Sequence, residues 1–254
     1  MSKINPDQAS AGSPPGSGPG GAAALSAAGS VQGERQFWGL VQRRECRVLT
    51  WRGRAAALLT GVAILIGAVR AAYPFLAISD PVPGGILIVE GWAPGYVLAE
   101  AQQQIDTRRY AKVYVTGGPL ERGVPLAEFK TYAALGAASL FTLGLNPAAV
   151  ETVPAAGVQR DRTYASALAL KQWLQDHRVP LNQINVITMG PHARRTRLLF
   201  TKAFGPGTTV GIVSVPSEDY EPAHWWRSSA GVRNVVGEVI GYAYARVAFN
   251  PQTD

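Results

Sequence analysis

Cysteine is nearly absent from this chain of 254 residues, and its single example is Cys46. The segment after residue 80 therefore has no cysteine, which excludes an intramolecular disulfide and cysteine-based metal or nucleophile chemistry there. Histidine is scarce too, and no H-E-x-x-H or paired spacing predicts a metal site. Glu90, Asp161 and His192 could still converge on a metal, such as Mg²⁺ that accompanies a phosphate. Serine-hydrolase chemistry is not expected, because no G-x-S-x-G elbow occurs.

Bulky apolar side chains are missing from the beginning of the chain, where Ser10 to Ser30 consists mainly of Ala, Gly, Ser and Pro. Such a composition cannot bury enough apolar surface to offset the entropy of ordering. We therefore predict a disordered tail over residues 1–34, followed by a basic juxtamembrane segment over 35–54.

Positive charge is unevenly distributed. Residues 1–54 hold seven Lys and Arg against three Asp and Glu, whereas residues 80–254 are nearly balanced at sixteen against fourteen. No basic stripe interleaved with aromatic residues occurs, so nucleic acid is not an expected partner. The excess before the apolar segment bears on membrane topology and anionic lipid instead.

A long apolar run predicts a transmembrane helix over residues 55–78. Ala55 to Val69 has no charge, and beyond Arg70 the chain stays apolar to Ile78. A bilayer core needs about 20 apolar residues, so Arg70 must snorkel or lie near an interface. A cleaved signal peptide and a buried core helix are the alternatives.

Arginines just before this run predict the orientation of a single-pass protein, with a cytoplasmic N-terminus and an extracytoplasmic C-terminal domain. They are Arg43, Arg44, Arg47, Arg52 and Arg54. Downstream, His224, Trp225 and Trp226 form a group that is expected in the core or on the membrane surface.

Residues 81–250 alternate short β-branched runs with helical patterns, which predicts one α/β domain whose mostly parallel sheet is covered on both faces. The expected strands are Ile86 to Val89, Lys112 to Thr116, Val150 to Val153, Ile184 to Met189 and Val210 to Val215. The expected helices are Tyr96 to Arg108, Leu126 to Leu143, Thr163 to His177, Arg194 to Phe204 and Ser228 to Val247.

Ligands of such sheets bind beyond the carboxyl ends of the strands. Gly190 to Phe200 follows the fourth strand, with His192 able to titrate near neutrality and Arg194 and Arg195 in the first helical turn. Arginines there oppose the helix dipole, which is unfavourable unless an anion is bound. Solvated arginines and a capping histidine are the alternative.

The segment after the third strand, like the one after the fourth, carries arginines at the start of an expected helix. Asp161 or Thr163 can cap the next helix, and Arg160 and Arg162 flank its start. Two helix N-termini that carry guanidinium groups into one crevice would form a phosphate cradle, whereas a capped helix with solvated charges is the simpler reading.

The turn after the second strand has the sequence VTGGP, from Val115 to Pro119. This sequence matches neither a G-x-G-x-x-G fingerprint nor a P-loop. Gly117 and Gly118 indicate only a close approach of the backbone. Glu128, expected early in the following helix, could line the crevice or complement the helix dipole.

The order of these residues resembles the bacterial YdcF/SanA/ElyC-like family, an envelope-associated domain of unknown function, over about Gly85 to Phe204. The resemblance implies a Rossmann-like three-layer domain, the bacterial cytoplasmic (inner) membrane, and a role in cell-wall or lipid-carrier metabolism. It places polar sites on Thr116, Gly117, Gly118, Glu128, Arg162, Thr163, His192 and Arg195. Gly91, after the first strand, is also an expected ligand-binding residue, although its loop lacks the family's glycine-rich turn. The chain departs from the family's asparagines around the threonine, because it has Arg162 before Thr163 and Ala165-Ser166 after it.

Two functions remain open from the sequence. The first is an envelope enzyme, a phosphate-ester or pyrophosphate hydrolase or transferase, that acts on a phosphorylated, lipid-linked substrate. In this enzyme His192 is the general acid or base and Glu128 assists it. The anion is held by Arg162, Arg194 and Arg195. The second is a non-catalytic module that binds a nucleotide-like or envelope ligand. The sequence identifies no cofactor for either.

Overall fold

The computed structural model describes residues 35–36, 41–42, 48–107, 109–120 and 128–251. The chain divides into two units, Met1–Gly53 and Arg54–Asp254. In the first unit, β1 (Arg35–Gln36) pairs antiparallel with β2 (Val41–Gln42). The predicted tail over 1–34 lies outside the described residues.

Five parallel strands form the sheet of the second unit, in the order β5-β4-β3-β6-β7. Their bounds are β3 Ile86–Glu90, β4 Val113–Gly117, β5 Val150–Pro154, β6 Gln183–Met189 and β7 Thr209–Val215. All five match the strands predicted from β-branched runs. The chain builds outward from β3 to β5 and then returns to β6 on the other side of β3, so the strand order reverses between β3 and β6.

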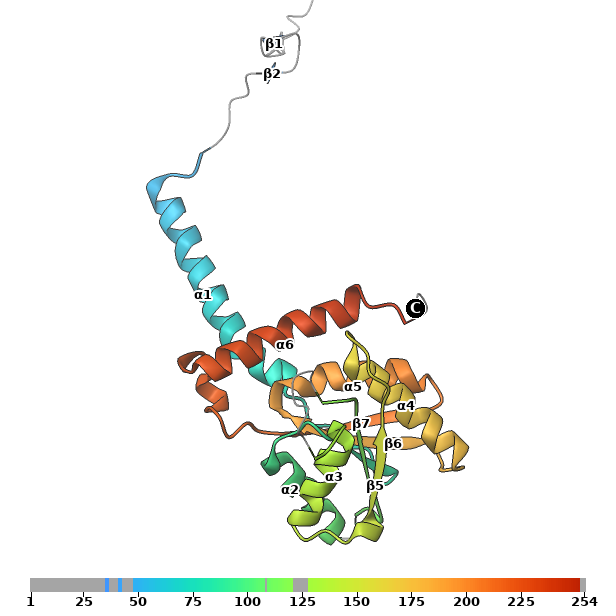
Figure 1. The fold of residues 1–254 in the computed structure, drawn as a ribbon. Coiled ribbons are helices and arrows are strands. Elements are labelled where there is room, and N and C mark those ends of the chain that lie inside the picture. Colours follow the sequence, from blue (N-terminus) through green and yellow to red (C-terminus); the bar gives the residue numbers. More distant parts are fainter. Residues whose placement is uncertain (1–34, 37–40, 43–47, 108, 121–127, 252–254) are drawn as a thin grey trace, which may run out of the picture. The chain divides into compact units, whose positions relative to one another are not determined.

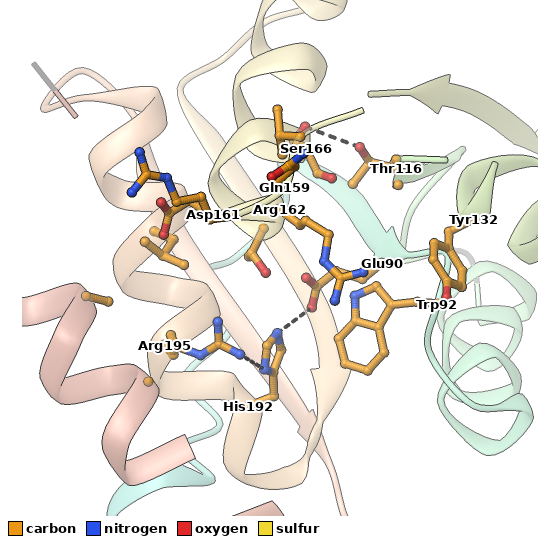
Figure 2. Close-up of a pocket in the computed structure, with 18 of the residues that line it drawn as sticks. Glu90, Trp92, Thr116, Tyr132, Gln159, Asp161, Arg162, Ser166, His192 and Arg195 are labelled. Atoms are coloured by element: carbon orange, nitrogen blue, oxygen red, sulfur yellow. Dashed lines mark hydrogen bonds and ion pairs between the residues drawn. The ribbon is translucent and has the colours of Figure 1, made fainter. Parts of the chain in front are cut away.

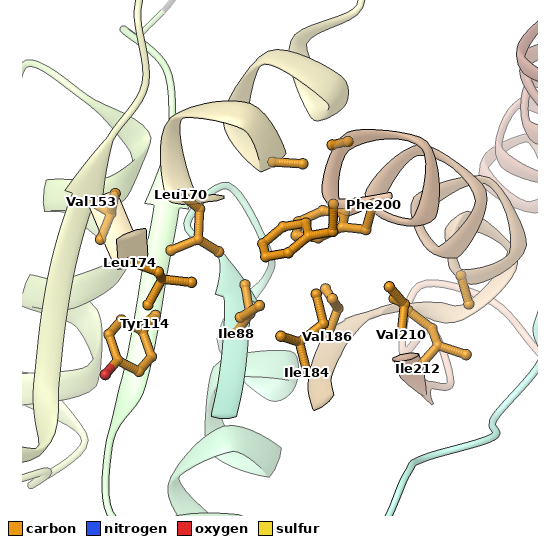
Figure 3. Packing of buried hydrophobic residues seen from close by; sticks show 14 residues of the cluster. Ile88, Tyr114, Val153, Leu170, Leu174, Ile184, Val186, Phe200, Val210 and Ile212 are labelled. Carbon is orange, nitrogen blue, oxygen red and sulfur yellow. The ribbon is translucent and has the colours of Figure 1, made fainter. Parts of the chain in front are cut away.

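Helices cover both faces of this sheet, which confirms the predicted Rossmann-like three-layer α/β fold (Figure 1). Their bounds are α2 Gly95–Asp106, α3 Tyr132–Thr142, α4 Arg162–Asp176, α5 Ala193–Phe204 and α6 Ser229–Val247, with short 3₁₀ turns at η1 Pro147–Ala149, η2 Gly190–His192 and η3 Pro222–Arg227. Helices α4 and α5 pack on one face through Leu170, Leu174 and Phe200 (Figure 3). Helices α2 and α3 pack on the other through Val97 and Leu140.

Helix α1 (Trp51–Leu76) precedes the sheet and contains the predicted membrane segment. It is long and apolar enough to cross a bilayer, with a mean hydropathy of 2.0 over its most apolar window, and none of that window is buried. A core helix would be buried, so that alternative is wrong. The helix is consistent with single-pass membrane anchoring.

The side chain of Asn185, fully buried in β6, holds the connection between α1 and the sheet. Its Oδ1 accepts a hydrogen bond from the backbone N–H of Val82 at 2.8 Å. Its Nδ2 donates to the carbonyl oxygens of Val82 at 3.0 Å and Gly84 at 2.9 Å. The side chain fits because residue 211 is glycine: a Cβ there would collide with Asn185 Oδ1. Asp80 pairs with Ile212 of β7 through two backbone hydrogen bonds, and the amide of Asn185 supplies the hydrogen bonds of the residues that follow.

We expect Asn185→Ala to lower the free energy of unfolding by about 3 kcal/mol, because three hydrogen bonds of about 1 kcal/mol each are lost. Urea unfolding of the full chain in detergent, followed by tryptophan fluorescence, measures this. The matched control is Asn182→Ala, whose side chain is exposed and whose effect should stay within about 0.5 kcal/mol. Equal effects of the two substitutions would contradict the role of Asn185.

Candidate functional site

A cavity of about 1320 Å³ lies at the carboxyl edge of the sheet, beside the point where the strand order reverses. Glu90 ends β3, Thr116 and Gly117 end β4, and His192 follows β6, so three strands deliver side chains to the same place. The first turn of α4 and one side of α6 complete the wall. This is the edge where a parallel sheet is expected to bind ligands.

His192 lies at the centre of a buried network of charged side chains. Its Nδ1 is 2.9 Å from Oε1 of Glu238, which comes from α6. Arg195 donates to both oxygens of the same carboxylate, from Nε at 2.8 Å and from Nη2 at 2.9 Å. Helix α6 is thereby tied to the start of α5 by one carboxylate, one imidazole and one guanidinium group.

Glu90 lies on the other side of the imidazole, with its Oε2 3.5 Å from Nε2 of His192 (Figure 2). That carboxylate is almost fully buried, and its Oε2 accepts hydrogen bonds from the hydroxyl groups of Thr188 at 2.8 Å and Thr196 at 3.3 Å. No described residue makes a hydrogen bond to His192 Nε2, although the atom is buried. The indole of Trp92 packs edge-on against the imidazole, with ring centroids 4.9 Å apart.

These contacts set the charges of the network. Burial by itself lowers the pKa of His192, but the charge of Glu90, the hydrogen bond to Glu238 and the charge of Glu238 outweigh it and raise that pKa to about 9. Burial by itself raises the pKa of Glu238, but Arg195 and His192 bring that pKa down to about 2. Burial by itself also raises the pKa of Glu90, but the charge of His192, the hydrogen bond from Thr188 and the charge of Arg195 together outweigh burial and lower that pKa. At neutral pH the network therefore holds an imidazolium between two carboxylates.

Local backbone geometry brings these groups together. Gly190 has φ 32° in the turn between β6 and α5, and an added Cβ there would lie 3.0 Å from Oη of Tyr73. Gly241 of α6 lies against the Arg195 side chain, where a Cβ would come within 3.1 Å of its Cδ and Nε. The two glycines let the chain turn sharply at His192 and let Arg195 lie across α6.

The start of α4 forms the opposite wall of the cavity. Asp161 occupies the N-cap position in a left-handed conformation, with φ 58°, and its side chain makes no capping hydrogen bond. Arg160, Arg162 and Thr163 line the cavity beside it, and Figure 2 shows Arg162 extending from α4 into the space near Glu90 and Trp92. The expected convergence of Arg162 and His192 on one crevice is therefore present in the structure.

The glycine turn after β4 also lines the cavity, through Thr116, Gly117 and Gly118. Thr116 is fully buried and donates to the carbonyl oxygen of Ser166 at 3.2 Å, which fixes the strand end to α4. A Cβ on Gly117 would lie 2.7 Å from Cβ of Tyr132, so the absence of a side chain at Gly117 allows the start of α3 to pack against the end of β4. Gly118 has more room, with 3.6 Å to the nearest atom.

Three predicted site residues are not among those that line the cavity. A Cβ on Gly91 would collide with the carbonyl oxygen of Tyr132, so this glycine serves the packing of α3. Arg194 donates a hydrogen bond from Nε to the carbonyl oxygen of Phe75. Its guanidinium carbon lies 4.1 Å from the centre of the phenyl ring of Phe75. It therefore interacts with the end of α1.

Glu128 is the third, and its predicted place in a helix is wrong. Helix α3 begins only at Tyr132, after Thr131 accepts a hydrogen bond from Ala134 N–H as N-cap. The preceding residues pair with the turn after β4 through Leu120 N–H to Lys130 O and a bridge between Pro119 and Thr131. This pairing holds the chain extended, and Glu128 is exposed ahead of it.

Glu238 is the site residue that the sequence analysis missed. It is the sole acidic residue of α6, and its nearest neighbours in sequence, Val235 to Gly237 and Val239 to Gly241, are apolar or small. An isolated carboxylate in such a helix was the available signal, because burying it requires a charged partner. The partners, His192 and Arg195, are more than 40 positions away, so spacing could not identify them.

A metal or cofactor is not indicated by any side-chain cluster in the described part of the chain, where no group of three or more His, Cys, Asp and Glu has suitable geometry. The sequence predicted that Asp161 could share a metal site with Glu90 and His192. In the structure Asp161 lies at the start of α4, and His192 contacts Glu90 and Glu238.

Stability should depend on pH through His192. Its folded pKa of about 9 exceeds the ordinary 6.5, so the stabilisation is fully present below pH 6.5 and is lost as the pH rises through 9. The loss should be on the order of 3 kcal/mol. Urea unfolding of wild type and His192→Gln between pH 6 and pH 9.5 measures it, and the difference between the two curves should shrink across this range. A constant difference would show that His192 is not held as an imidazolium.

The chain matches no protein-family model, no curated protein and no solved structure. The resemblance to the YdcF/SanA/ElyC-like family, which depends on the order of a few residues, therefore stays a prediction.

Proposed function

We propose that this protein is anchored in the bacterial cytoplasmic membrane by α1 and binds a phosphorylated ligand of the lipid-carrier or cell-wall-precursor type in its cavity. The observation that carries the proposal is an excess of positive charge at the carboxyl edge of the sheet, around a buried imidazolium. The arginines that precede α1 support a cytoplasmic N-terminus and an extracytoplasmic domain.

The charges that line the cavity favour an anion. With His192 protonated, five lining residues are positive and three are negative. His192 contacts Glu90 and Glu238, and Arg195 contacts Glu238. The rest of the lining adds three arginines and one carboxylate, Arg160, Arg162, Arg233 and Asp161, so the cavity keeps an excess of two positive charges. Guanidinium groups match phosphate oxygens in pairs of parallel hydrogen bonds.

Helix α4 adds a second source of positive potential. The N–H groups in the first turn of any α-helix have no partner within the helix, and the dipole makes that end positive. Here the N-cap side chain of Asp161 makes no capping bond, and the first turn lines the cavity with Arg162 and Thr163. A phosphate at this end would combine helix and side-chain contacts.

His192 supplies the proton in the catalytic form of the proposal. Glu238 holds Nδ1–H, so Nε2–H is the group directed toward Glu90 and the cavity. Nε2 would donate its proton to the leaving oxygen of a phosphate ester as the P–O bond breaks, and the anionic Glu90 would accept a proton from the attacking water. Glu238 and Arg195 position the imidazole and need not touch the ligand.

A non-catalytic binding module is the second candidate. The observation that favours it is the pairing of Arg195 with Glu238, which also holds Nδ1 of His192 in place without any ligand. Such pairing can serve to stabilise the cavity wall alone.

Replacing Arg162 should weaken anion binding without loss of fold. We expect Arg162→Gln to raise the Kd for pyrophosphate about tenfold, since a charge-assisted hydrogen bond contributes about 1.5 kcal/mol or more. Isothermal titration calorimetry of the full chain in detergent measures the constant. Arg109→Gln, at the far end of α2, is the control and should bind as wild type. Unchanged affinity in both variants would place the anion elsewhere.

Turnover separates the two candidates. Nucleotides, sugar phosphates and polyprenyl phosphates are first screened for those that raise the melting temperature of the protein. The compounds that do so are then incubated with the protein, and the released phosphate is measured. If the protein is an enzyme, His192→Gln should lower kcat at least 100-fold with a small change in KM, because the proton donor acts in the transition state. Glu238→Gln should move the alkaline limb of the pH profile of kcat to lower pH, because Glu238 raises the pKa of His192. Binding of a ligand without release of phosphate by wild type would support the binding module.

A further inference from the structure

Helix α6 exposes an apolar stripe to its surroundings. Ile240 is 65% exposed and Val247 is 86% exposed, and Val232, Val236 and Val239 are each at least 40% exposed. At about 100° per residue these five side chains fall within an arc of about 100°, which is one face of the helix. Five large apolar side chains aligned on one face are more than the scattered exposure that a soluble surface shows.

The other faces of α6 are occupied. Glu238 and Gly241 face the cavity, with Arg195 lying across them. Val235 is buried in a cluster that contains Leu76 and Tyr73 of α1, and Tyr242 packs against Phe75 with ring centroids 5.7 Å apart. The helix is therefore fixed between the cavity and the end of α1, and the apolar stripe lies on the remaining side of the helix, where it is exposed.

The contacts between α1 and the domain give the depth of α6 relative to a bilayer. Side chains of α1 are exposed from Arg54 through Ala68, and the domain first meets the helix at Val69, whose carbonyl oxygen accepts a hydrogen bond from Trp225 Nε1 at 3.1 Å. From Trp51 to Val69 the helix rises about 27 Å, close to the roughly 30 Å of a hydrocarbon core.

The side chains at this level are those of a membrane interface. Arg70 lies 5.5 Å from the ring centre of Trp226, which adjoins Trp225. Tryptophan and snorkelling arginine are the residues that mark the boundary between headgroups and acyl chains. Helix α6, which packs against the same end of α1, lies beside this boundary, and Figure 1 shows it running crosswise to α1 there.

We propose that α6 is an interfacial helix whose apolar stripe docks into the surface of the bilayer that α1 spans. Amphipathic helices of this kind lie in the interface plane with one apolar face among the headgroups and upper acyl chains. Arg246 falls at the margin of the stripe away from the cavity, where its charge meets anionic lipid phosphates.

Docking of α6 has a consequence for the cavity. The helix has the bilayer on one side and the cavity on the other, so the cavity lies one helix diameter, about 10 Å, from the membrane surface. A ligand with a lipid tail could keep the tail in the bilayer while its headgroup enters the cavity. The docking itself depends on the anchor and not on which ligand is bound.

Fluorescence quenching tests the proposal in the full chain. Cysteines replace Val239, Ile240, Leu58 or Gln103 one at a time in a Cys46→Ser background and are labelled with the environment-sensitive dye NBD. The proteins are reconstituted into vesicles of phosphatidylcholine and phosphatidylglycerol that contain doxyl-labelled lipid. Leu58, exposed in α1, reports the anchor, and Gln103, exposed on α2, reports the solvent.

We expect labels at Val239 and Ile240 to emit at shorter wavelength and to be quenched at least threefold more than the label at Gln103. Quenching at Leu58 without quenching at Val239 and Ile240 would overturn the docking of α6 while leaving the anchor intact. Absence of quenching at Leu58 as well would overturn the anchor and the docking together. A blue shift at Ile240 without lipid quenching would show that protein covers the stripe, either a second copy or the N-terminal tail, and would also overturn the proposal.

Discussion

The imidazolium of His192 between two buried carboxylates is the interaction on which the arrangement of the site depends. A buried charge is costly unless it is paired, and here each of Glu90, Glu238 and His192 would be unfavourable without the others. The three groups come from the end of β3, the turn after β6 and the middle of α6. Their pairing therefore fixes the last helix against the switch point of the sheet, and the cavity wall follows from it.

The position of α6 then connects the cavity to the membrane segment. Glu238 holds one side of the helix through Arg195 and His192, and Val235 and Tyr242 hold another side against α1. Arg194, next in sequence to Arg195, points the opposite way and contacts Phe75 of α1. Adjacent arginines on α5 thus contact the cavity wall and the end of α1 separately, which links the site to α1.

Much of the fold could be predicted because its signals are local. Strands buried on both faces read as short apolar runs, and all five lie where such runs occur. The start of α3 could not be predicted in this way, because pairing of Thr131 with Pro119 overrides the helical pattern around Glu128. Cavity residues that follow the ends of strands, such as His192 and Gly118, could be predicted by the same topological rule.

The sequence alone determined that the chain has an apolar helix followed by a parallel α/β sheet, since hydrophobic periodicity and β-branched runs act over a few neighbouring residues. It also determined which edge of the sheet collects polar side chains. Only the tertiary structure decided that Glu238 completes the site, that Arg194 leaves it and that α6 presents an apolar face beside α1. These are contacts between residues far apart in the chain, and their free energy depends on burial and distance, which a linear pattern does not encode.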